Sequence, residues 1–162
     1  MITVVRPGPL TTVQDLGRPG WAHLGVPRSG ALDAPALARA NRLVGNPDAT
    51  AGLETTLLGC ALRFARAAVV AVTGAPAAVL VDGAPVGFGT RVEVPAGATV
   101  DVGRATVGVR SYLAVAGGID VEPVLGSRST DTLSGLGPPR LAPGMQLPVG
   151  APYAEAIPAA AP

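Results

Sequence analysis

The segment AVVAVTGAPAAVLVDGA, residues 68–84, decides the fold class of this chain. Valine and alanine fill two short apolar runs, which Gly74 and Pro76 separate and which Asp82-Gly83 follows. Valine favours extended strands, and an Asp-Gly pair accepts the positive φ of a tight hairpin turn. The pattern therefore predicts strands over 68–73 and 78–81, with a hairpin turn at 81–84.

Further short strands are predicted on both sides of this segment. The runs lie at 2–5, 53–58, 61–64, 90–94, 99–102 and 106–115, and a last short strand follows a turn at 143–147. The chain contains 22 Gly and 17 Pro, which interrupt long helices. Many short strands joined by tight turns predict a mainly β domain. A closed barrel is favoured over an open sandwich, because closure removes exposed strand edges.

One segment has the period of a helix. Asp33 is suited to cap its amino end and Gly45 to stop it, so we expect a helix over about 33–44. Asn41 falls on its apolar face, and Glu54 sits in an apolar strand. Buried polar groups need partners, so the two side chains are expected to bond to each other and fix the helix to the sheet. Glu54 as a general acid or base with a raised pKa is the alternative.

The bulk properties bound the class of protein. A length of 162 residues suits one domain, predicted at 1–150, with an Ala/Pro-rich linker or tail at 151–162. The net charge of +1 and the absence of a basic cluster argue against a nucleic-acid partner. The sequence has neither an apolar run long enough to cross a membrane nor a signal-peptide pattern, so we expect a cytoplasmic protein without a membrane partner.

Residue usage excludes several chemistries. One cysteine and one histidine leave no disulfide framework and too few ligands for a typical zinc cage, so no metal site is predicted. All twelve basic residues are arginine. A Walker A loop needs a lysine for the phosphates, and Schiff-base chemistry needs an amine, so neither can come from this chain.

The first polar segment with chemical potential is GVPRSGALD, residues 25–33, which runs into the start of the predicted helix. A helix amino end offers unpaired N–H groups to an anion, and Arg28 would add a bidentate grip. Arg28, Ser29 and Asp33 are therefore candidate catalytic residues. In the alternative interpretation, Ser29 and Asp33 only cap backbone groups and Arg28 is solvated.

The second polar segment follows the bend at 117–120 and continues through 126–131. Small polar residues around an arginine can present hydroxyls and N–H groups to an anion. Arg128 and Asp131 are candidate catalytic residues, with Asp131 either a base or an orienting partner of Arg128. The candidate cofactor-binding residues of this segment are Gly117, Gly118, Ser127, Ser129 and Thr130. A solvated loop is the alternative. We expect the two polar segments to meet at one pocket mouth.

Three long motifs of the chain resemble one family. They are TVQDLGR at 12–18 with the loop at 25–33, NRLVGN at 41–46 leading into LETTL at 53–57, and YLAVAGGID at 112–120 with VLGSRSTD at 124–131. This chain resembles the family of the carboxyltransferase domain, subdomain A/B. Its members include the C subunit of 5-oxoprolinase, KipA or allophanate hydrolase subunit 2, and the carboxyl-transfer part of urea carboxylase. Family chains are about twice as long, so the match is to an amino-terminal half.

The resemblance implies a cyclophilin-like β-barrel and a hydrolase, the ATP-dependent 5-oxoprolinase that opens the lactam of 5-oxoproline to glutamate. It implies a small amide or lactam substrate, ATP as cofactor, and two partner subunits, one KipI-like and one LamB/YcsF-like. Arginines of the polar loops would steady anionic oxygens. One alternative is a biotin-dependent carboxyltransferase acting on urea or a related amide. A second is a non-catalytic module that regulates a kinase.

Overall fold

The computed structural model describes residues 1–153, so 154–162 of the predicted tail lie outside the described residues. The elements in chain order are β1 (Ile2–Arg6), β2 (Thr11–Gln14), the 3-10 turn η1 (Ala22–Leu24), α1 (Ala34–Val44), β3 (Gly52–Thr56), β4 (Cys60–Phe64), β5 (Ala68–Gly74), β6 (Ala77–Val81), β7 (Ala84–Val86), β8 (Val92–Val94), β9 (Thr99–Ala105), β10 (Arg110–Val115) and β11 (Gln146–Leu147). The mainly β prediction is confirmed. No helix in the described part of the chain is long and apolar enough to cross a membrane.

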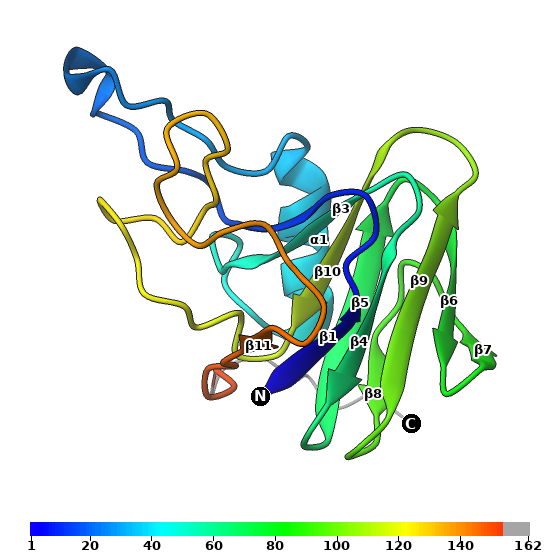
Figure 1. The fold of residues 1–162 in the computed structure, drawn as a ribbon. Coiled ribbons are helices and arrows are strands. Elements are labelled where there is room, and N and C mark those ends of the chain that lie inside the picture. Colours follow the sequence, from blue (N-terminus) through cyan, green and yellow to red (C-terminus); the bar gives the residue numbers. More distant parts are fainter. Residues whose placement is uncertain (154–162) are drawn as a thin grey trace.

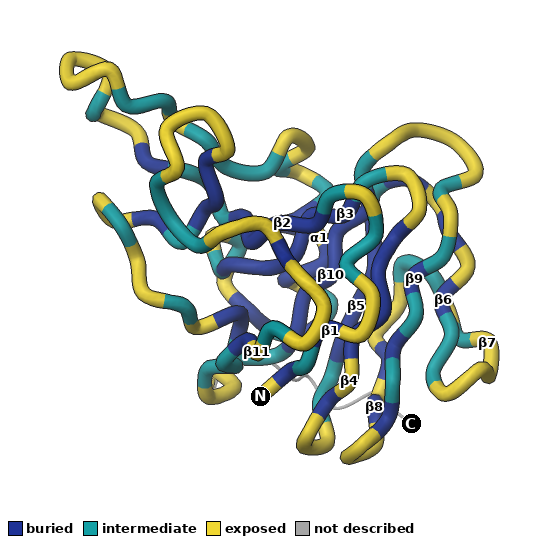
Figure 2. The backbone as a smooth tube through the Cα atoms, viewed as in Figure 1, coloured by how far each residue is buried: buried dark blue, intermediate teal, exposed yellow. Residues whose placement is uncertain are grey.

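The strands form two antiparallel sheets (Figure 1). The first has six strands in the order β11-β1-β4-β9-β6-β7, and the second has five in the order β2-β3-β10-β5-β8. Alternation along each strand sends one set of side chains between the sheets. In β5, Val70 and Val72 enter this shared core, whereas Ala71 faces the other way, toward α1. Figure 2 shows the resulting buried runs along the central strands.

Helix α1 packs on the outer face of the second sheet. Its small apolar contacts are Ala40 and Val44, against Ala71 of β5 and Ala114 of β10. The carboxylate of Asp33 accepts a hydrogen bond from the amide of Ala36 at 3.0 Å, and the chain leaves the helix at a left-handed glycine. The predicted helix at 33–44 and both of its ends are therefore confirmed.

The predicted closed barrel is wrong, because the described strands leave both sheets open. Closure is not needed to protect the edges here. Strands β7 and β8 have three residues each, and β7 contains Pro85, which offers no N–H for pairing. Edge strand β2 is covered by later loops, since Thr130 and Leu141 donate their amides to carbonyls of β2 at 2.8 Å each. Short edge strands and covering loops therefore protect the sheet edges, and a closed barrel is not required.

Most local predictions hold, and two fail. The hairpin at 81–84 is present between β6 and β7, with Asp82 and Gly83 at φ 48° and 81°. Strand β10 begins only at Arg110, because 106–109 forms the preceding turn. Strand β2, at Thr11–Gln14, is not among the predicted strands.

The predicted bond between Asn41 and Glu54 is also wrong. Asn41 lies near the carboxyl end of α1, and its side-chain amide donates to the carbonyls of Asp48 and Thr50 at 3.2 and 2.8 Å. Glu54 pairs in register with Tyr112 on the neighbouring strand and bonds to its hydroxyl at 2.8 Å. The two polar groups serve different ends of the helix.

Candidate functional site

Asp15, in the loop that follows β2, contacts both polar segments: its carbonyl accepts from the amide of Ala31 at 2.9 Å, and its carboxylate binds the second segment. Figure 1 shows the loop after β2 and the loop before β11 running side by side at one end of the molecule. The carboxylate oxygen Oδ1 of Asp15 accepts from the hydroxyls of Ser127 and Ser129, each at 2.6 Å. Its Oδ2 accepts from the amide of Arg128 at 2.7 Å. One carboxylate therefore fixes three consecutive residues of the second segment.

A buried arginine makes the second connection between the segments. Arg18 is only 1% exposed, and its Nη2 donates to the carbonyl of Ser129 at 2.6 Å. Its Nε donates to the carbonyl of Val124 at 3.2 Å, and its Nη1 donates to the hydroxyl of Ser29 at 3.3 Å. The guanidinium group of Arg18 thus joins the first polar segment to the second.

Asp15 and Arg18 were missed as functional candidates in the sequence. Both lie in a stretch rich in glycine and proline, where charged residues are usually solvated. A usable signal existed in the spacing, since two opposite charges three residues apart open a loop whose next charged residue is Arg28. Their partners in the second polar segment lie more than 100 residues away, so the sequence could not reveal that they hold it.

The predicted cofactor-binding residues are occupied by bonds within the protein. The amide of Ser127 donates to Val124, and that of Ser129 donates to the Ser127 hydroxyl at 3.0 Å. The amide of Thr130 donates to β2, that of Gly117 to the side chain of Asn46, and that of Gly118 to Val115. An anion-binding nest needs N–H groups that point outward unpaired. These five amides do not form one.

The predicted catalytic residues of the first segment lie at the surface of the loop and at the helix cap. Arg28 is exposed, and its carbonyl accepts from the amide of Arg18 at 2.7 Å. Ser29 has a left-handed backbone, φ 56°, and its hydroxyl accepts from Arg18. Asp33 caps α1. These contacts favour the alternative interpretation of this segment, in which its polar side chains hold the backbone in place.

Asp131 caps a turn of its own. Its carboxylate accepts from the amides of Leu133 and Ser134, at 3.1 and 3.3 Å, and from the Ser134 hydroxyl. The Ser134 hydroxyl holds the pKa of Asp131 below its usual range. A lowered pKa weakens a base, so these bonds favour a turn-capping role over proton abstraction.

Arg128 and Gly117 are the predicted site residues that line a cavity. No residue of 25–33 lines it, so the expected common pocket mouth of the two polar segments is wrong for this cavity. This cavity of about 230 Å³ opens beside the Arg128 side chain, and the polar side chains in its wall are Asp15, Thr50, Asp120, Arg128 and Tyr153. The Nε of Arg128 donates to the carbonyl of Val121 at 2.7 Å, and its Nη2 pairs with Asp120 at 2.9 Å. The second segment therefore carries its arginine in a fixed orientation at the cavity wall.

Two buried asparagines behind the cavity wall position the segments that line it. Asn41 donates to the carbonyls of Asp48 and Thr50, and so shapes the turn after α1. Asn46 donates to Asn41 at 3.1 Å and accepts from the amide of Gly117 at 2.9 Å. The asparagines thereby hold the turn at 47–51 against the bend at 117–120. We name the space between them the Thr50 cavity.

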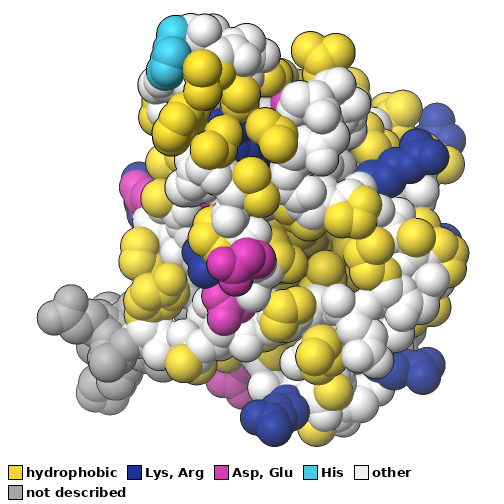
Figure 3. Space-filling view, turned by 60° about the vertical axis from the view of Figure 1, so that its left-hand side comes forward, with side chains coloured by type: hydrophobic (Ala, Val, Ile, Leu, Met, Phe, Trp, Pro, Cys, Tyr) yellow, Lys and Arg dark blue, Asp and Glu magenta, His cyan; other side chains and the backbone are white. Residues whose placement is uncertain are grey.

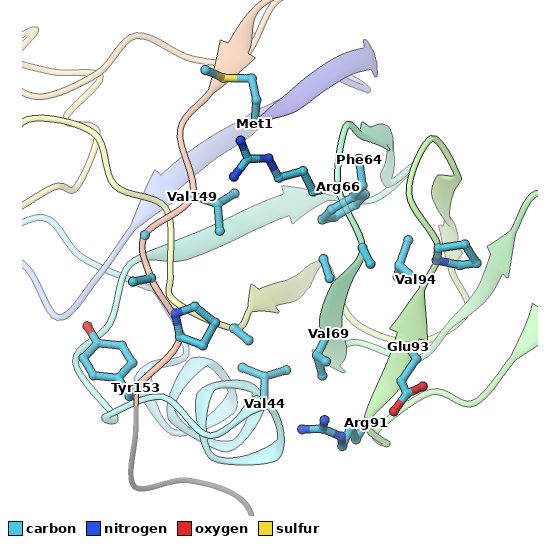
Figure 4. A pocket seen from close by; sticks show the side chains of 17 residues that line it. Met1, Val44, Phe64, Arg66, Val69, Arg91, Glu93, Val94, Val149 and Tyr153 are labelled. Atoms are coloured by element: carbon cyan, nitrogen blue, oxygen red, sulfur yellow. The ribbon is translucent and has the colours of Figure 1, made fainter.

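A larger cavity lies on the other side of the segment 149–153 (Figure 4). Its volume is about 870 Å³, and most of its lining residues are apolar, among them Val44 of α1, Val69 of β5 and Val94 of β8. Arg66 and Arg91 lie at its rim, and Tyr153 is among the residues that it shares with the Thr50 cavity. None of the predicted site residues lines it. We therefore place the candidate site in the smaller, polar cavity.

Glu54, the alternative acid or base of the sequence, lies elsewhere. Its Oε2 accepts from the amide of Leu32 at 2.9 Å and from the hydroxyl of Tyr112 at 2.8 Å. Its Oε1 lies 3.4 Å from the guanidinium of Arg110. Burial raises the pKa of Tyr112, so its hydroxyl stays protonated and remains a donor to Glu54. The cluster binds the start of α1 to the sheet.

The remaining candidate groups do not gather into a site. Within residues 1–153, no group of three or more His, Cys, Asp or Glu side chains is placed to hold a metal ion. His23 is exposed and stacks on Trp21, with ring centroids 6.3 Å apart. Figure 3 shows the imidazole, the one cyan group, at an extremity of the molecule.

Comparison with known proteins identifies the family. The profile described as "Carboxyltransferase domain, subdomain A and B" matches residues 24–161, most of the chain. The chain belongs to the carboxyltransferase domain, subdomain A and B, family.

Some relatives of this chain are named as the C subunit of 5-oxoprolinase, and others as urea amidolyase or urea carboxylase. The chain is 44% identical over 153 residues to the C subunit of 5-oxoprolinase from Escherichia coli (strain K12), and this match covers 93% of the chain and 49% of the relative. It is 43% identical over 137 residues to urea amidolyase of Saccharomyces cerevisiae, covering 84% of the chain and 8% of that protein. The chain therefore spans about half the length of the 5-oxoprolinase relative and a small part of the amidolyase.

Solved structures agree with this carboxyltransferase-domain assignment. The crystal structure of Kluyveromyces lactis urea amidolyase matches with a TM-score of 0.85 and 37% identity, over 96% of this chain and 10% of that one. The structure of the urea carboxylase of the same organism matches with a TM-score of 0.78 and 43% identity, over 80% of this chain and 12% of that one. The two-sheet fold with its outer helix is thus the fold of this family.

Proposed function

We propose that this chain is the amino-terminal half of the C subunit of a 5-oxoprolinase, which opens the lactam of 5-oxoproline to glutamate with the energy of ATP hydrolysis. The observation that carries the proposal is the 44% identity to the Escherichia coli protein over 93% of this chain. The working enzyme would contain a KipI-like subunit and a LamB/YcsF-like subunit as partners. This chain alone would be inactive, because it spans about half of the relative that it resembles.

The role we assign to this chain is positioning of the substrate beside a fixed cation. Cleavage of a lactam places negative charge on its carbonyl oxygen, and preorganised donors stabilise that charge. Arg128 is held by two bonds to its own loop, and that loop is anchored on Asp15. Its guanidinium needs no reorganisation when charge develops.

ATP does not fit the described residues of this chain. Nucleotide phosphates are typically held by a lysine together with rows of unpaired N–H groups, and the sequence contains no lysine. The loop amides predicted to serve that purpose are all bonded internally. We therefore propose that one of the partner subunits holds the nucleotide.

The test is reconstitution of the complex with the KipI-like and LamB/YcsF-like subunits and the remaining half of the C subunit. We expect release of glutamate from 5-oxoproline that depends on ATP. Replacement Arg128→Ala removes the donor and should lower kcat about 10²- to 10³-fold. Arg63→Ala, at an exposed position of β4, is the matched control and should leave the rate unchanged. Absence of glutamate release in the intact complex would reject the proposal.

A second function is supported by the similarity to urea amidolyase, which nearly equals the first in identity. In that case the complex would transfer a carboxyl group from carboxybiotin to urea or a related amide. Biotin would come from a partner, because biotin attachment needs a lysine and the sequence has none. Urea-dependent consumption of carboxybiotin by the same complex, with no turnover of 5-oxoproline, would favour this function over the first.

A further inference from the structure

The cavity of about 870 Å³ beside the segment 149–153 leaves an apolar part of the second sheet open (Figure 4). We name it the Val69 cavity, after a residue of its wall. We infer that the second half of the carboxyltransferase domain packs into this cavity and covers it. The inference rests on the proposed function, since it takes this chain to be an amino-terminal half, but it does not depend on which substrate the domain serves.

Helix α1 is too short to cover the whole outer face of the second sheet. Ala71 and Ala114 are completely buried beneath it. Val69 and Ala116 point to the same side, because each lies two residues along the chain from one of these alanines. Both are only partly buried, and both line the Val69 cavity. The helix ends at Val44, which lines the cavity as well, so an apolar strip of the sheet stays open beyond it.

The Val69 cavity also borders the core between the two sheets. Phe64 of β4 and Val94 of β8 come from different sheets and belong to the main core cluster. Both of them line the cavity. A side chain that enters the cavity therefore meets apolar side chains of both sheets. Burial of apolar surface of this kind is the main force that holds two protein surfaces together.

The segment 149–153 indicates which partner fills the cavity. All five of its residues line the wall, and Figure 4 shows Val149 and Tyr153 across the cavity from Val94. The match to the Escherichia coli relative covers 93% of this chain and 49% of that protein. In an amino-terminal half, the chain therefore leads into the second half along this wall. Such a tether holds the second half at an effective concentration on the order of millimolar, so a modest apolar contact is enough to keep the cavity filled.

The charges at the rim of the cavity define the surface of the partner. Arg66 and Arg91 are exposed, and neither forms an ion pair within residues 1–153. Figure 4 shows them at opposite ends of the cavity, and Glu93 is the one acidic residue among the described residues that line it. Protein interfaces combine an apolar centre with a polar rim. We expect the second half to bring apolar side chains to the centre and carboxylates to Arg66 and Arg91.

The experiment measures how fast a thiol reagent labels a cysteine at position 67, in this chain and in the full C subunit, by mass spectrometry of the labelled peptide. Ala67 is exposed and lines the cavity, so Ala67→Cys should be labelled rapidly in this chain alone. In the full subunit the second half covers it, and labelling should become about 10-fold slower or more. Ala84→Cys is the matched control, at an exposed position of edge strand β7 outside the cavity, and should be labelled equally fast in both proteins.

A bulky substitution checks that the protection comes from packing into the cavity. Ala67→Trp places a large side chain where the second half would enter. It should leave the melting temperature of this chain unchanged, because position 67 is exposed. It should lower the melting temperature of the full subunit, because the two halves can no longer close on each other. Ala84→Trp is the control and should leave both melting temperatures unchanged.

Equal labelling of Ala67→Cys in the two proteins would overturn the inference. Slow labelling in this chain alone would overturn it as well, since the cavity would then already be covered, and so would an equal effect of Ala67→Trp on both melting temperatures. These results are separable from the proposed function. Protection of position 67 in a full subunit whose complex releases no glutamate would leave the inference standing and reject the function. Glutamate release with position 67 unprotected would do the reverse.

Discussion

Arg18 is the residue on which the arrangement of the polar loops depends most. It is among the largest fully buried side chains, and no carboxylate of the described chain lies within ion-pair distance of it. Three oxygens, from Val124, Ser129 and Ser29, solvate the guanidinium in place of water. A charge that is buried this way is stable only while all of its bonds are kept.

Replacement Arg18→Met should therefore destabilise the protein strongly. The methionine keeps the apolar stem but leaves the buried carbonyl of Ser129 without its donor. We therefore expect a loss of about 1–3 kcal/mol in the free energy of unfolding. Urea denaturation measures the loss. Arg63→Met replaces an exposed arginine of β4 and should change stability by less than about 0.5 kcal/mol. Equal stabilities of the two variants would contradict the role given to Arg18.

At the scale of elements, one row of polar side chains joins the helix to the second sheet. Glu54 of β3, Tyr112 of β10 and Thr73 of β5 are neighbours in register across that sheet. Tyr112 accepts from the amide of Asp33 at 2.8 Å, and Thr73 donates to the carbonyl of Ala36 at 2.7 Å. The first turn of α1 is thus hydrogen-bonded to the sheet, while its later turns pack on alanines.

Removal of the Tyr112 hydroxyl tests this connection. Tyr112→Phe leaves the amide of Asp33 without its acceptor and takes one donor from Glu54, so unfolding should become easier by about 1–2 kcal/mol. Thermal denaturation followed by circular dichroism measures the change. Tyr153→Phe is the matched control, since Tyr153 is the other tyrosine of the sequence and is 47% exposed. A control that loses as much stability as Tyr112→Phe would show that the hydroxyl bridge contributes nothing.

The sequence could predict those elements whose signals lie in neighbouring residues. The helix at 34–44 and the hairpin at 81–84 are set by residues next to them, namely Asp33, Gly45 and Asp82-Gly83. Barrel closure depends on which strands meet after folding, and no local pattern carries that information. Strand β2 was missed because its sequence, TTVQ, is polar, and its edge is covered by loops that arrive more than 100 residues later.

The candidate site follows the same rule. The second polar segment carries Arg128 at the wall of the cavity, whereas no residue of the first polar segment lines it. The pairing of Asp15 with Ser127 and Ser129 joins positions more than 100 residues apart, so only the fold reveals it. Thr50 carried no signal, because a threonine in a turn is usually solvated. The sequence indicates the segments, and the fold supplies the residues that hold them.

For the molecule as a whole, Cys60 reports whether the two-sheet core is intact. It is the one cysteine of the sequence, lies in central strand β4 of the first sheet and is 0% exposed. It belongs to a core cluster with residues from both sheets, including Leu53 of β3, and it pairs in register with Val102 of β9. A reagent can reach the sulfur only when the sheets separate.

Burial raises the pKa of the Cys60 thiol to about 11. Because the folded pKa lies above the ordinary value, the thiol is neutral in the folded protein at pH 8, where only about one molecule in a thousand would carry the reactive thiolate. Labelling by a disulfide reagent at pH 8 should therefore be slow in buffer. It should accelerate with urea over the same range in which circular dichroism records unfolding, and both probes should give one midpoint.

Two variants make that result decisive. Cys60→Ala should abolish labelling, and Thr132→Cys in the Cys60→Ala background should be labelled within the mixing time of an exposed thiol, since position 132 is exposed. Rapid labelling of the parent protein in buffer, at the rate of the Thr132→Cys variant, would mean that the core opens locally around β4. The two sheets would then not unfold as one unit, and the stability losses predicted for Arg18→Met and Tyr112→Phe would have to be measured for each sheet separately.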